Sequence, residues 1–248
     1  MNFNIITIFP DFIDSFKQTG FIKRAIEKNL ISVNSINLRS FSTDKHNRVD
    51  DRPYGGGPGM ILQYEPIRKS LLSLDLQKKN NKVIYLSPQG KTLTQKKLNS
   101  FLILDNITLL CGRYEGIDQR VIDDFIDEEI SVGDYVVSGG EIPSMLLVEG
   151  ICRLIPGAID DQESIKEESF QNNFLDYPHF TRPEVINNKK VPEVLLKGNH
   201  LEISMWRRKE ALGATWLKRP ELLKNVKLSK EDDKLLNDYI SEFKKGKA

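Results

Sequence analysis

Glycine and polar residues gather at three places where a short apolar run of the chain ends. These places are residues 85–90 (YLSPQG), 111–118 (CGRYEGID) and 132–141 (VGDYVVSGGE). Turns of this composition expose backbone amide and carbonyl groups, which suit a purine and a ribose. A single turn of this kind is common in α/β folds for structural reasons alone, whereas three of them together predict one concave ligand site.

A fourth segment is richer still in glycine. Residues 53–59 contain four glycines and two prolines in seven positions, and they follow Asp50, Asp51 and Arg52. This composition cannot continue a helix or a strand, so we expect tight turns whose exposed amides suit an anion or a close-lying ligand. The segment matches neither a P-loop nor a dinucleotide-binding fingerprint. The alternative interpretation is a flexible surface turn.

Two segments in the second half of the chain could serve acid–base chemistry or RNA binding. The first, residues 160–168, contains the carboxylates Asp160, Asp161, Glu163, Glu167 and Glu168. A positioned carboxylate can accept a proton, although most such groups beside a loop are merely solvated. The second, residues 206–209 (WRRK), interleaves aromatic and basic side chains as nucleic-acid surfaces do. Its alternative is a helix with a solvated basic face.

Regular elements must position these segments. We expect strands at residues 3–9, 33–39, 82–86, 107–110 and 129–132, and helices at residues 11–28, 95–104, 116–126 and 143–155. Strands that alternate with helices predict an α/β fold with a mostly parallel sheet. In such a fold the ligand loops lie at the carboxyl ends of the strands.

The rest of the chain predicts a second, smaller domain. Residues 159–175 are polar and lack hydrophobic periodicity, which is typical of a linker. Beyond them we expect no strand, but helices at residues 201–212 and 229–243, the latter with Ser229 and Asp232 in a capping box. The predicted domains are therefore residues 1–158 and residues 176–248, separated by the linker.

The charge of the chain is balanced overall but divided along its length. The 248 residues carry a net charge of +1, yet residues 1–114 carry +8, residues 115–168 carry −12 and residues 169–248 carry +5. Basic ends suit a polyanion, and an acidic middle suits a proton, a cation or a cationic cofactor. Runs of like charge also occur simply as solvated faces.

Composition excludes several classes of protein. No apolar run approaches the roughly 18 residues that a membrane helix needs, so we expect no membrane partner. The first ten residues lack the basic start and the cleavage site of a secretory signal, which favours the cytoplasm. Two cysteines, Cys111 and Cys152, and three scattered histidines provide neither a disulfide framework nor a zinc site.

Seven motifs, taken in order along the chain, resemble those of the bacterial tRNA (guanine-N1) methyltransferases. They are DDRPYGGGPGM, YLSPQG, CGRYEGID, VGDYVVSGGE, LDYPHFTRP, GNH and WRRKEALGATWLKRPELL, and the likeness extends from Asn4 to about Leu223. This family methylates the guanine at position 37 of tRNA, beside the anticodon, and so supports maintenance of the reading frame. The resemblance implies the same activity here. It also implies a homodimer, in which the linker and C-terminal domain of one subunit complete the site of the other.

The resemblance further implies a fold and a cofactor. The family belongs to the SPOUT methyltransferases, whose parallel α/β domain contains a deep trefoil knot and is followed here by a small helical domain. S-adenosylmethionine lies bent in the knot. The residues implied to hold it are Tyr85, Leu86, Ser87, Pro88, Gln89, Gly90, Gly112, Tyr114, Glu115, Gly116, Val132, Gly133, Asp134, Tyr135, Val136, Val137, Ser138, Gly139, Gly140 and Pro143.

Catalytic roles are implied residue by residue. The family's base is an Asp that precedes Ser-Phe in the linker, where this chain has Glu168, and its stabiliser of charge on O6 is an Arg that matches Arg153. Glu115 corresponds to a carboxylate near the methyl donor and its supporting magnesium ion, Mg2+. Asp176 matches a position linked to holding the guanine. Because Glu is one methylene longer than Asp, other carboxylates remain candidates for the base, namely Asp160, Asp161 and Glu167.

Two other classes share part of this pattern. A SPOUT enzyme that acts on ribosomal RNA or on a ribose 2′-oxygen would have the three glycine loops but lack the motifs at residues 175–183 and 206–223. A non-catalytic RNA-binding module would keep the basic surfaces without needing three intact cofactor loops. Both classes therefore fit the sequence less well than the tRNA methyltransferases.

Overall fold

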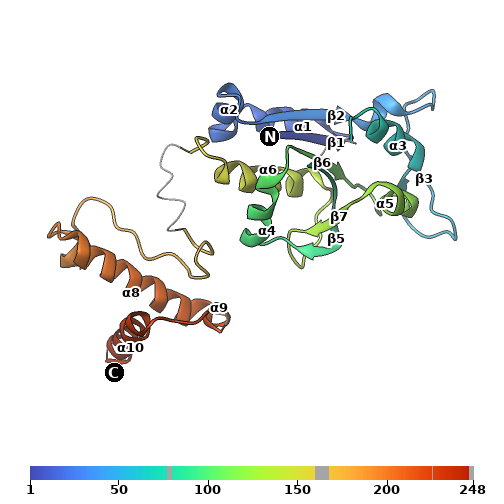
Figure 1. Ribbon diagram of the computed structural model, residues 1–248. Coiled ribbons are helices and arrows are strands. Elements are labelled where there is room, and N and C mark those ends of the chain that lie inside the picture. Colours follow the sequence, from blue (N-terminus) through green and yellow to red (C-terminus); the bar gives the residue numbers. More distant parts are fainter. Residues whose placement is uncertain (77–79, 160–167, 225, 246–248) are drawn as a thin grey trace. The chain divides into compact units, whose positions relative to one another are not determined.

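The computed structural model describes residues 1–76, 80–159, 168–224 and 226–245 of the 248 residues. The chain divides into two compact units, Met1–Gln162 and Glu163–Ala248, whose elements are labelled in Figure 1. Within the described residues, no helix is both long and apolar enough to cross a membrane.

A five-stranded parallel sheet forms the centre of the first unit. Its strands are β1 (Asn2–Thr7), β2 (Ser32–Asn37), β5 (Asn81–Thr92), β6 (Asn106–Cys111) and β7 (Glu128–Ser131). They lie in the order β2-β1-β6-β5-β7, and every neighbouring pair is parallel. The apolar runs of β1 and β6 are buried on both faces, as the strands of parallel sheets usually are. The prediction of a parallel α/β sheet is confirmed.

Helices cover both faces of this sheet (Figure 1). They are α1 (Pro10–Lys17), α2 (Gly20–Glu27), α3 (Tyr64–Leu72), α4 (Gln95–Ser100), α5 (Gln119–Phe125) and α6 (Glu141–Leu154), with 3-10 turns η1 (Leu38–Phe41) and η2 (Phe101–Ile103). One apolar cluster joins the sheet to α1, α2, α4 and α6. A second joins it to α3 and α5.

The helix predicted at residues 95–104 ends at Ser100 and is followed by η2, and the helix predicted at residues 201–212 extends over residues 200–218. Two other expected helices differ in their bounds for reasons that single residues explain. The helix predicted at residues 11–28 is two helices, because Gly20 has a φ of +60° and interrupts the regular backbone. The helix predicted at residues 116–126 begins only at Gln119, where the Asp118 carboxylate accepts a hydrogen bond of 3.0 Å from the Arg120 backbone amide and caps the helix.

Strand β5 runs further than predicted because it continues beyond a bulge. Leu86 and Lys91 both lie opposite Ile130 of β7, so residues 87–90 bulge out of the ladder. Gly90 makes this return to β7 feasible, because a Cβ atom at Gly90 would lie 2.4 Å from the Glu129 carbonyl carbon. The motif at residues 85–90 is therefore a pinched loop within one strand rather than a loop between two elements.

The glycine-rich segment at residues 53–59 extends from a short antiparallel pair. Strand β3 (Asp50–Asp51) pairs with β4 (Ile61–Leu62) at its base. The Leu62 amide donates a hydrogen bond of 3.0 Å to the Gly116 carbonyl, which fixes the base of the segment beside the loop that follows β6.

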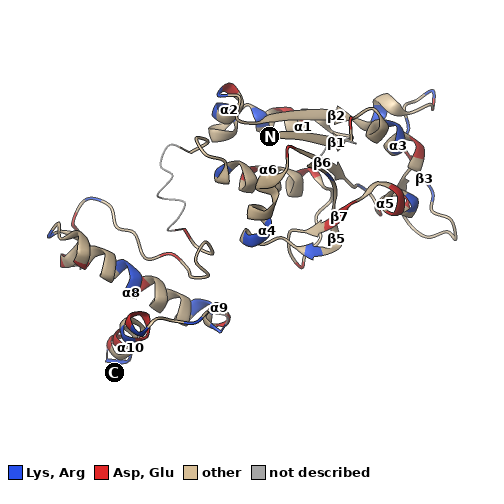
Figure 2. Ribbon diagram, viewed as in Figure 1, with Lys and Arg blue, Asp and Glu red and all other residues tan. Residues whose placement is uncertain are grey.

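The second unit is mainly helical. It contains β8 (Val185–Ile186), β9 (Lys189–Lys190), η3 (Glu193–Leu195), α8 (His200–Lys218), α9 (Pro220–Leu223) and α10 (Lys230–Lys245). The expectation that no strand follows the linker is wrong, because β8 and β9 form a small antiparallel hairpin. Figure 2 shows basic residues in the middle of α8 and at its end beside α9.

Helices α8 and α10 pack closely. The Tyr239 ring lies against Gly213, where a Cβ atom would be 2.3 Å from the ring. The Arg208 guanidinium donates hydrogen bonds of 2.7 and 2.9 Å to the Asp232 carboxylate, and these bonds hold the pKa of Asp232 below its usual value. The predicted cap is present, since the Asp232 amide donates to Ser229 Oγ at 3.0 Å.

Part of the predicted linker lies within the second unit. Phe174 is buried, and the Leu175 amide donates a hydrogen bond of 2.8 Å to Thr215 Oγ1 of α8. Residues 160–167 lie outside the described residues, so the domain division at residues 158 and 176 stays a prediction.

Gly90→Ala tests the pinched strand. The added methyl group would overlap the backbone of β7, which cannot move without breaking the ladder, so we expect the free energy of unfolding to fall by about 1–3 kcal/mol. Urea denaturation measures this change. Gly150→Ala in α6 is the matched control, because its methyl group meets side-chain atoms of Leu98 and no strand backbone, and alanine favours a helix by roughly 1 kcal/mol. Equal losses in the two variants would contradict the role given to Gly90.

Candidate functional site

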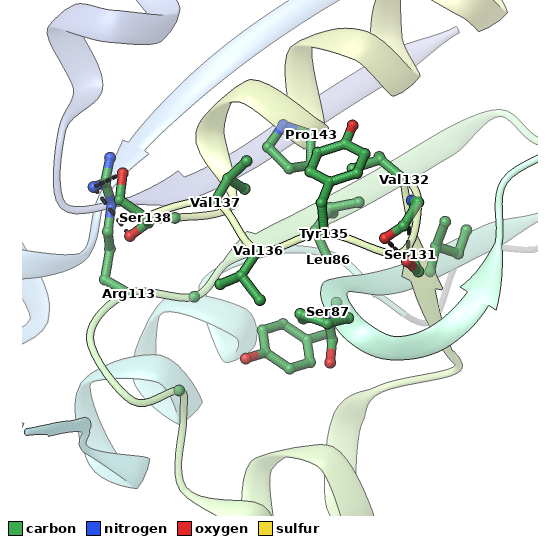
Figure 3. A pocket seen from close by; sticks show the side chains of 18 of the residues that line it. Leu86, Ser87, Arg113, Ser131, Val132, Tyr135, Val136, Val137, Ser138 and Pro143 are labelled. Carbon is green, nitrogen blue, oxygen red and sulfur yellow. Dashed lines mark hydrogen bonds between the residues drawn. The ribbon is translucent and has the colours of Figure 1, made fainter.

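A cavity of about 250 Å³ lies at the bulge of β5 and at the carboxyl ends of β6 and β7 (Figure 3). Three loops wall it, and they are the three segments singled out in the sequence. The predicted cofactor residues that line it are Tyr85, Leu86, Ser87, Pro88, Gly112, Tyr114, Glu115, Gly116, Val132, Gly133, Tyr135, Val136, Val137, Ser138, Gly139, Gly140 and Pro143. The structure thus brings together most of the predicted set in one place, which is where the strand-end rule puts a ligand.

Three predicted residues do not line the cavity. Gly90 is pressed against the backbone of β7, and Gln89 and Asp134 are exposed outside the lining. Three others line it without having been predicted, namely Arg113, Ile130 and Ser131. Arg113 lies between two predicted residues of the motif at 111–118, so taking the whole motif would have included it. Ile130 and Ser131 are the last two residues of β7 and precede the motif at 132–141, so the motifs gave no signal for them.

A buried carboxylate joins two of the three loops to the sheet. Glu141, the first residue of α6, is 1% exposed. It accepts hydrogen bonds from Arg113 Nε at 2.9 Å and from Thr7 Oγ1 of β1 at 2.6 Å, and Arg113 Nη2 lies 2.8 Å from the same carboxylate. Arg113 Nη1 also donates to the Ser138 carbonyl at 3.3 Å (Figure 3). We call Thr7, Arg113 and Glu141 the buried clamp.

Glycine is required where these loops meet. The Gly140 amide donates a hydrogen bond of 3.0 Å to the Gly112 carbonyl. A Cβ atom at Gly140 would lie 2.6 Å from the Cys111 Cα, and one at Gly139 would lie 2.1 Å from Arg113 Nε. The two loops can approach this closely only because side chains are absent, which gives a physical reason for Gly-Gly in the motif at residues 132–141.

Two ionisable side chains at the site, Tyr85 and Cys111, are kept neutral by burial. Burial raises the pKa of Tyr85 to about 12, and the charge of Glu129 adds to the rise. Burial also raises the pKa of the Cys111 thiol, again with help from a carboxylate, that of Glu141. A thiol in this state is a poor nucleophile. The cavity therefore suits a bound ligand better than covalent catalysis.

Glu115 connects the cavity to the glycine-rich segment. Its amide donates to the Met60 carbonyl at 3.0 Å, and its side chain lies against Gly59, where a Cβ atom would be 2.4 Å from the Glu115 Cγ. Residues 53–59 themselves do not line the cavity. Among the described residues, no cluster of three His, Cys, Asp or Glu side chains could hold a metal ion.

The four predicted catalytic residues are divided between the two units. Glu115 lines the cavity, and Arg153 lies half-buried in the last turn of α6, outside the cavity lining. Glu168 and Asp176 belong to the second unit. Asp176 Oδ1 accepts a hydrogen bond of 2.7 Å from the Tyr177 amide, and Oδ2 lies 2.9 Å from His179 Nε2. The alternative base candidates Asp160, Asp161 and Glu167 lie outside the described residues.

Glu168 lines a separate hollow of about 360 Å³ within the second unit. The hollow lies between the segment 168–177 and helix α8. Its lining mixes a carboxylate, an amide, an imidazole and two guanidinium groups with apolar side chains: Glu168, Asn172, Phe174, Leu175, Tyr177, His200, Ile203, Ser204, Arg207, Arg208 and Ala211. The Arg207 and Arg208 guanidinium groups lie 4.9 Å from the Tyr177 ring and 4.4 Å from the Phe174 ring. Sequence reasoning found the basic and aromatic residues of α8 but not this hollow.

The fold and the cavity define an α/β protein that holds its ligand on glycine loops at the carboxyl ends of parallel strands. A family model described as tRNA (Guanine-1)-methyltransferase TrmD matches residues 1–225, and the chain belongs to this family. The predicted family is thus confirmed, and with it a tRNA (guanine-N1)-methyltransferase activity class.

Similar proteins of known name agree with this assignment. The chain is 50% identical over 249 residues to a tRNA (guanine-N(1)-)-methyltransferase of Buchnera aphidicola subsp. Baizongia pistaciae, with 100% of both chains covered. It is 48% identical over 239 residues to the protein of the same name from Vibrio campbellii, covering 96% of this chain and 97% of the relative. A further relative, from Buchnera aphidicola subsp. Acyrthosiphon pisum, is 52% identical over 223 residues, with 90% and 94% covered.

Glu141→Gln tests the buried clamp. The change leaves the Arg113 guanidinium beside a neutral amide, so we expect the free energy of unfolding to fall by up to about 3 kcal/mol. We also expect a clear loss of affinity for S-adenosylmethionine, the methyl donor that a methyltransferase implies, because two cavity loops lose their common anchor. Thermal unfolding and titration calorimetry measure the two effects.

Glu128→Gln is the matched control for the clamp. Glu128 also pairs with two cations, Lys82 at 3.0 Å and Lys97, but it lies outside the cavity lining. It should lose stability and keep cofactor affinity. If Glu141→Gln behaves in the same way as this control, the clamp does not position the loops.

Proposed function

We propose that the protein transfers a methyl group from S-adenosylmethionine to N1 of the guanine at position 37 of tRNA, acting in the cytoplasm as a homodimer. The observation that carries the proposal is the cavity at the bulge of β5 and the ends of β6 and β7, because it is built from three of the motifs on which the family resemblance rests. Its walls offer backbone amides and carbonyls together with the apolar side chains of Val136, Val137 and Pro143. Such a lining suits an adenosine group.

The charges around the cavity suit a cationic ligand. Glu115 lies in the lining, and one carboxylate oxygen of Glu129 is buried without a hydrogen-bond partner in the described part of the chain. Burial raises the pKa of Tyr85 in the cavity wall, and the nearby Glu129 carboxylate adds to that rise. Bound S-adenosylmethionine supplies an electrophilic methyl group on a positively charged sulfur. Nearby carboxylates would favour binding of that charge.

A trefoil knot in the first unit is part of the proposal. Its support is the tight contact between the loop after β7 and the end of β6, where Gly140 meets the backbone of Cys111 and Gly112. A threaded chain would need such a contact, since it must pass through the preceding loop without side chains in the way. Gln89, Gly90 and Asp134 would then shape the loops without touching the cofactor.

Proton removal from guanine is the chemical difficulty of the reaction. N1 of a neutral guanine holds a proton and is a poor nucleophile, so a base near N1 and a cation near O6 would both speed transfer. We assign the base to Glu168 and the cation to Arg153, and we assign Asp176 to holding the guanine. The lining of the hollow around Glu168 supports this, because its aromatic and guanidinium planes suit a nucleobase.

Magnesium has a smaller part in the proposal. Mg2+ commonly binds through one or two carboxylates together with oxygens of the substrate. Glu115 is the side chain of the cavity lining that would contribute, and the described residues form no ligand cluster around it. The residues present do not form a site by themselves, so we derive no step of the reaction through the ion.

The surface around the cavity supports a dimer. Large apolar side chains are exposed in and next to its loops, namely Phe9, Val136, Ile142 and Leu146, with Val136 at 84% exposure. Exposed apolar residues gathered at one site commonly mark a protein interface. We infer that a second copy of the chain covers them, and that its second unit brings Glu168 and Asp176 to the cavity.

The proposed activity predicts methylation of G37 alone. Labelled S-adenosylmethionine and two transcripts of one tRNA, with G or A at position 37, should give transfer only to the first, and mapping should place the methyl group on N1. The control is the same assay without enzyme. Methylation of a ribose, or of ribosomal RNA in place of either transcript, would show instead that the protein acts on the substrates of the other SPOUT enzymes.

Glu168→Gln tests the base. Gln cannot accept the N1 proton, so the single-turnover rate should fall by on the order of 10²-fold or more, with the affinity for S-adenosylmethionine unchanged. Glu184→Gln, an exposed carboxylate of the same unit, is the control. An unaltered rate in Glu168→Gln would move the role to a neighbouring carboxylate.

Mixing two inactive variants tests the shared site. Arg153 lies in the unit with the cavity, whereas Glu168 lies in the other unit. If each active site takes these residues from different chains, dimers formed from Arg153→Ala and Glu168→Gln chains contain one intact site, and part of the activity should return on co-expression. Mixtures that stay inactive would place both residues of a site in one chain.

A further inference from the structure

The glycine-rich loop at residues 53–59 does not line the cavity, yet it carries an exposed side chain that packing in the core does not explain. Tyr54 is 100% exposed, more than any other large hydrophobic or aromatic side chain among the described residues. Arg52, beside it in sequence, is also exposed. A fully exposed tyrosine gains nothing from packing, so its position needs another reason.

The glycines of the loop serve its backbone shape rather than its packing. Gly55, Gly56 and Gly57 have φ values of +84°, +79° and +111°, and a Cβ atom at any of them would meet nothing within 4 Å. Space is therefore available for side chains, and the backbone conformation alone demands glycine. Gly59 also has a positive φ, of +80°, so four of the five residues 55–59 adopt a backbone conformation that favours glycine.

The base of the loop is fixed beside the cavity. β3 and β4 pair across it, and the Gln63 amide donates to the Val49 carbonyl at 2.8 Å. Gly59 then lies against the side chain of Glu115, which lines the cavity. A substrate whose reacting base reaches the cavity would therefore have its neighbouring nucleotides close to this loop.

We propose that residues 52–59 form an RNA-contact arm, in which Tyr54 stacks on an unpaired nucleobase of the tRNA and Arg52 meets a neighbouring phosphate. The inference rests on the proposed tRNA substrate. A nucleobase is the favoured occupant because the position beside the modified guanine is single-stranded in an anticodon loop, and unpaired bases stack on exposed aromatic rings. The adjacent arginine supplies the charge that the backbone of such a strand requires.

The test compares Tyr54→Ala with Tyr54→Phe in the full-length protein. Loss of one base–aromatic stack should raise the KM for tRNA roughly 10-fold, whereas Phe keeps the ring and should behave as the wild type. The affinity for S-adenosylmethionine and the melting temperature should not change in either variant, because the side chain touches neither the cavity nor the core. Ile103→Ala, which removes another exposed apolar side chain (75%), is the matched control and should leave the KM unchanged.

A second readout reports the stack directly. A tRNA transcript with 2-aminopurine in the anticodon loop should change its fluorescence on binding to the wild type and to Tyr54→Phe, and not on binding to Tyr54→Ala. An unchanged KM for Tyr54→Ala would overturn the proposal that residues 52–59 form an RNA-contact arm. Equal damage in both variants would show that the hydroxyl matters and would overturn stacking. Failure of the wild type to methylate tRNA in the same assay would instead overturn the proposed function.

Discussion

The ion pair between Glu141 and Arg113 is the interaction on which the organisation of the first unit depends. A carboxylate that is 1% exposed is tolerable only with full compensation, and here a guanidinium, a threonine hydroxyl and the amino end of α6 provide it. The three partners come from β1, from the loop after β6 and from the start of α6. One buried charge thus fixes the two loops that wall most of the cavity relative to the sheet.

The pairing with Glu141 also offsets the charge of the arginine in the cavity lining. Arg113 is turned toward Glu141 and the Phe9 ring, 4.6 Å from the guanidinium carbon, and its Nη1 also donates to the carbonyl and hydroxyl oxygens of Ser138. Its charge is therefore largely neutralised at the cavity wall. A cationic cofactor would meet little repulsion there, although an arginine is part of the wall.

Much of the fold was predictable because the signals were local. Strands β1, β5 and β6 contain short apolar runs and β2 alternates apolar with polar residues, and the three motifs lie at or just after the strands that the sequence indicates. Breaks that depend on a single backbone angle were not predictable, such as the interruption at Gly20. The hairpin of β8 and β9 was missed because each strand has two residues, too few for any periodicity. Its turn is Asn187-Asn188, and both residues have positive φ. Because asparagine is common in such two-residue turns, the Asn-Asn pair was the available clue in the sequence.

The glycines of the site could be predicted from the sequence, whereas the contacts between residues far apart in the chain could not. A motif shows that Gly139 and Gly140 are unusual, but it does not show that Arg113 lies against them. The clamp joins residues 28 and 134 positions apart, and nothing in a single sequence indicates which of its many charged residues meet. The sequence did place Arg153 in the first domain and Glu168 in the linker beyond it, and the structure assigns Glu168 to the second unit.

The pinched strand has a consequence for how a ligand reaches the cavity. Because Leu86 and Lys91 both lie opposite Ile130, residues 87–90 are closed at their neck by the pairing of the sheet itself. This wall cannot swing outward unless the end of β7 detaches from β5. The other two walls, at residues 112–116 and 132–140, are joined to each other by a backbone hydrogen bond and are anchored to β1 by the clamp. All three walls are therefore held by the sheet, and a ligand would enter a preformed cavity rather than displace a wall.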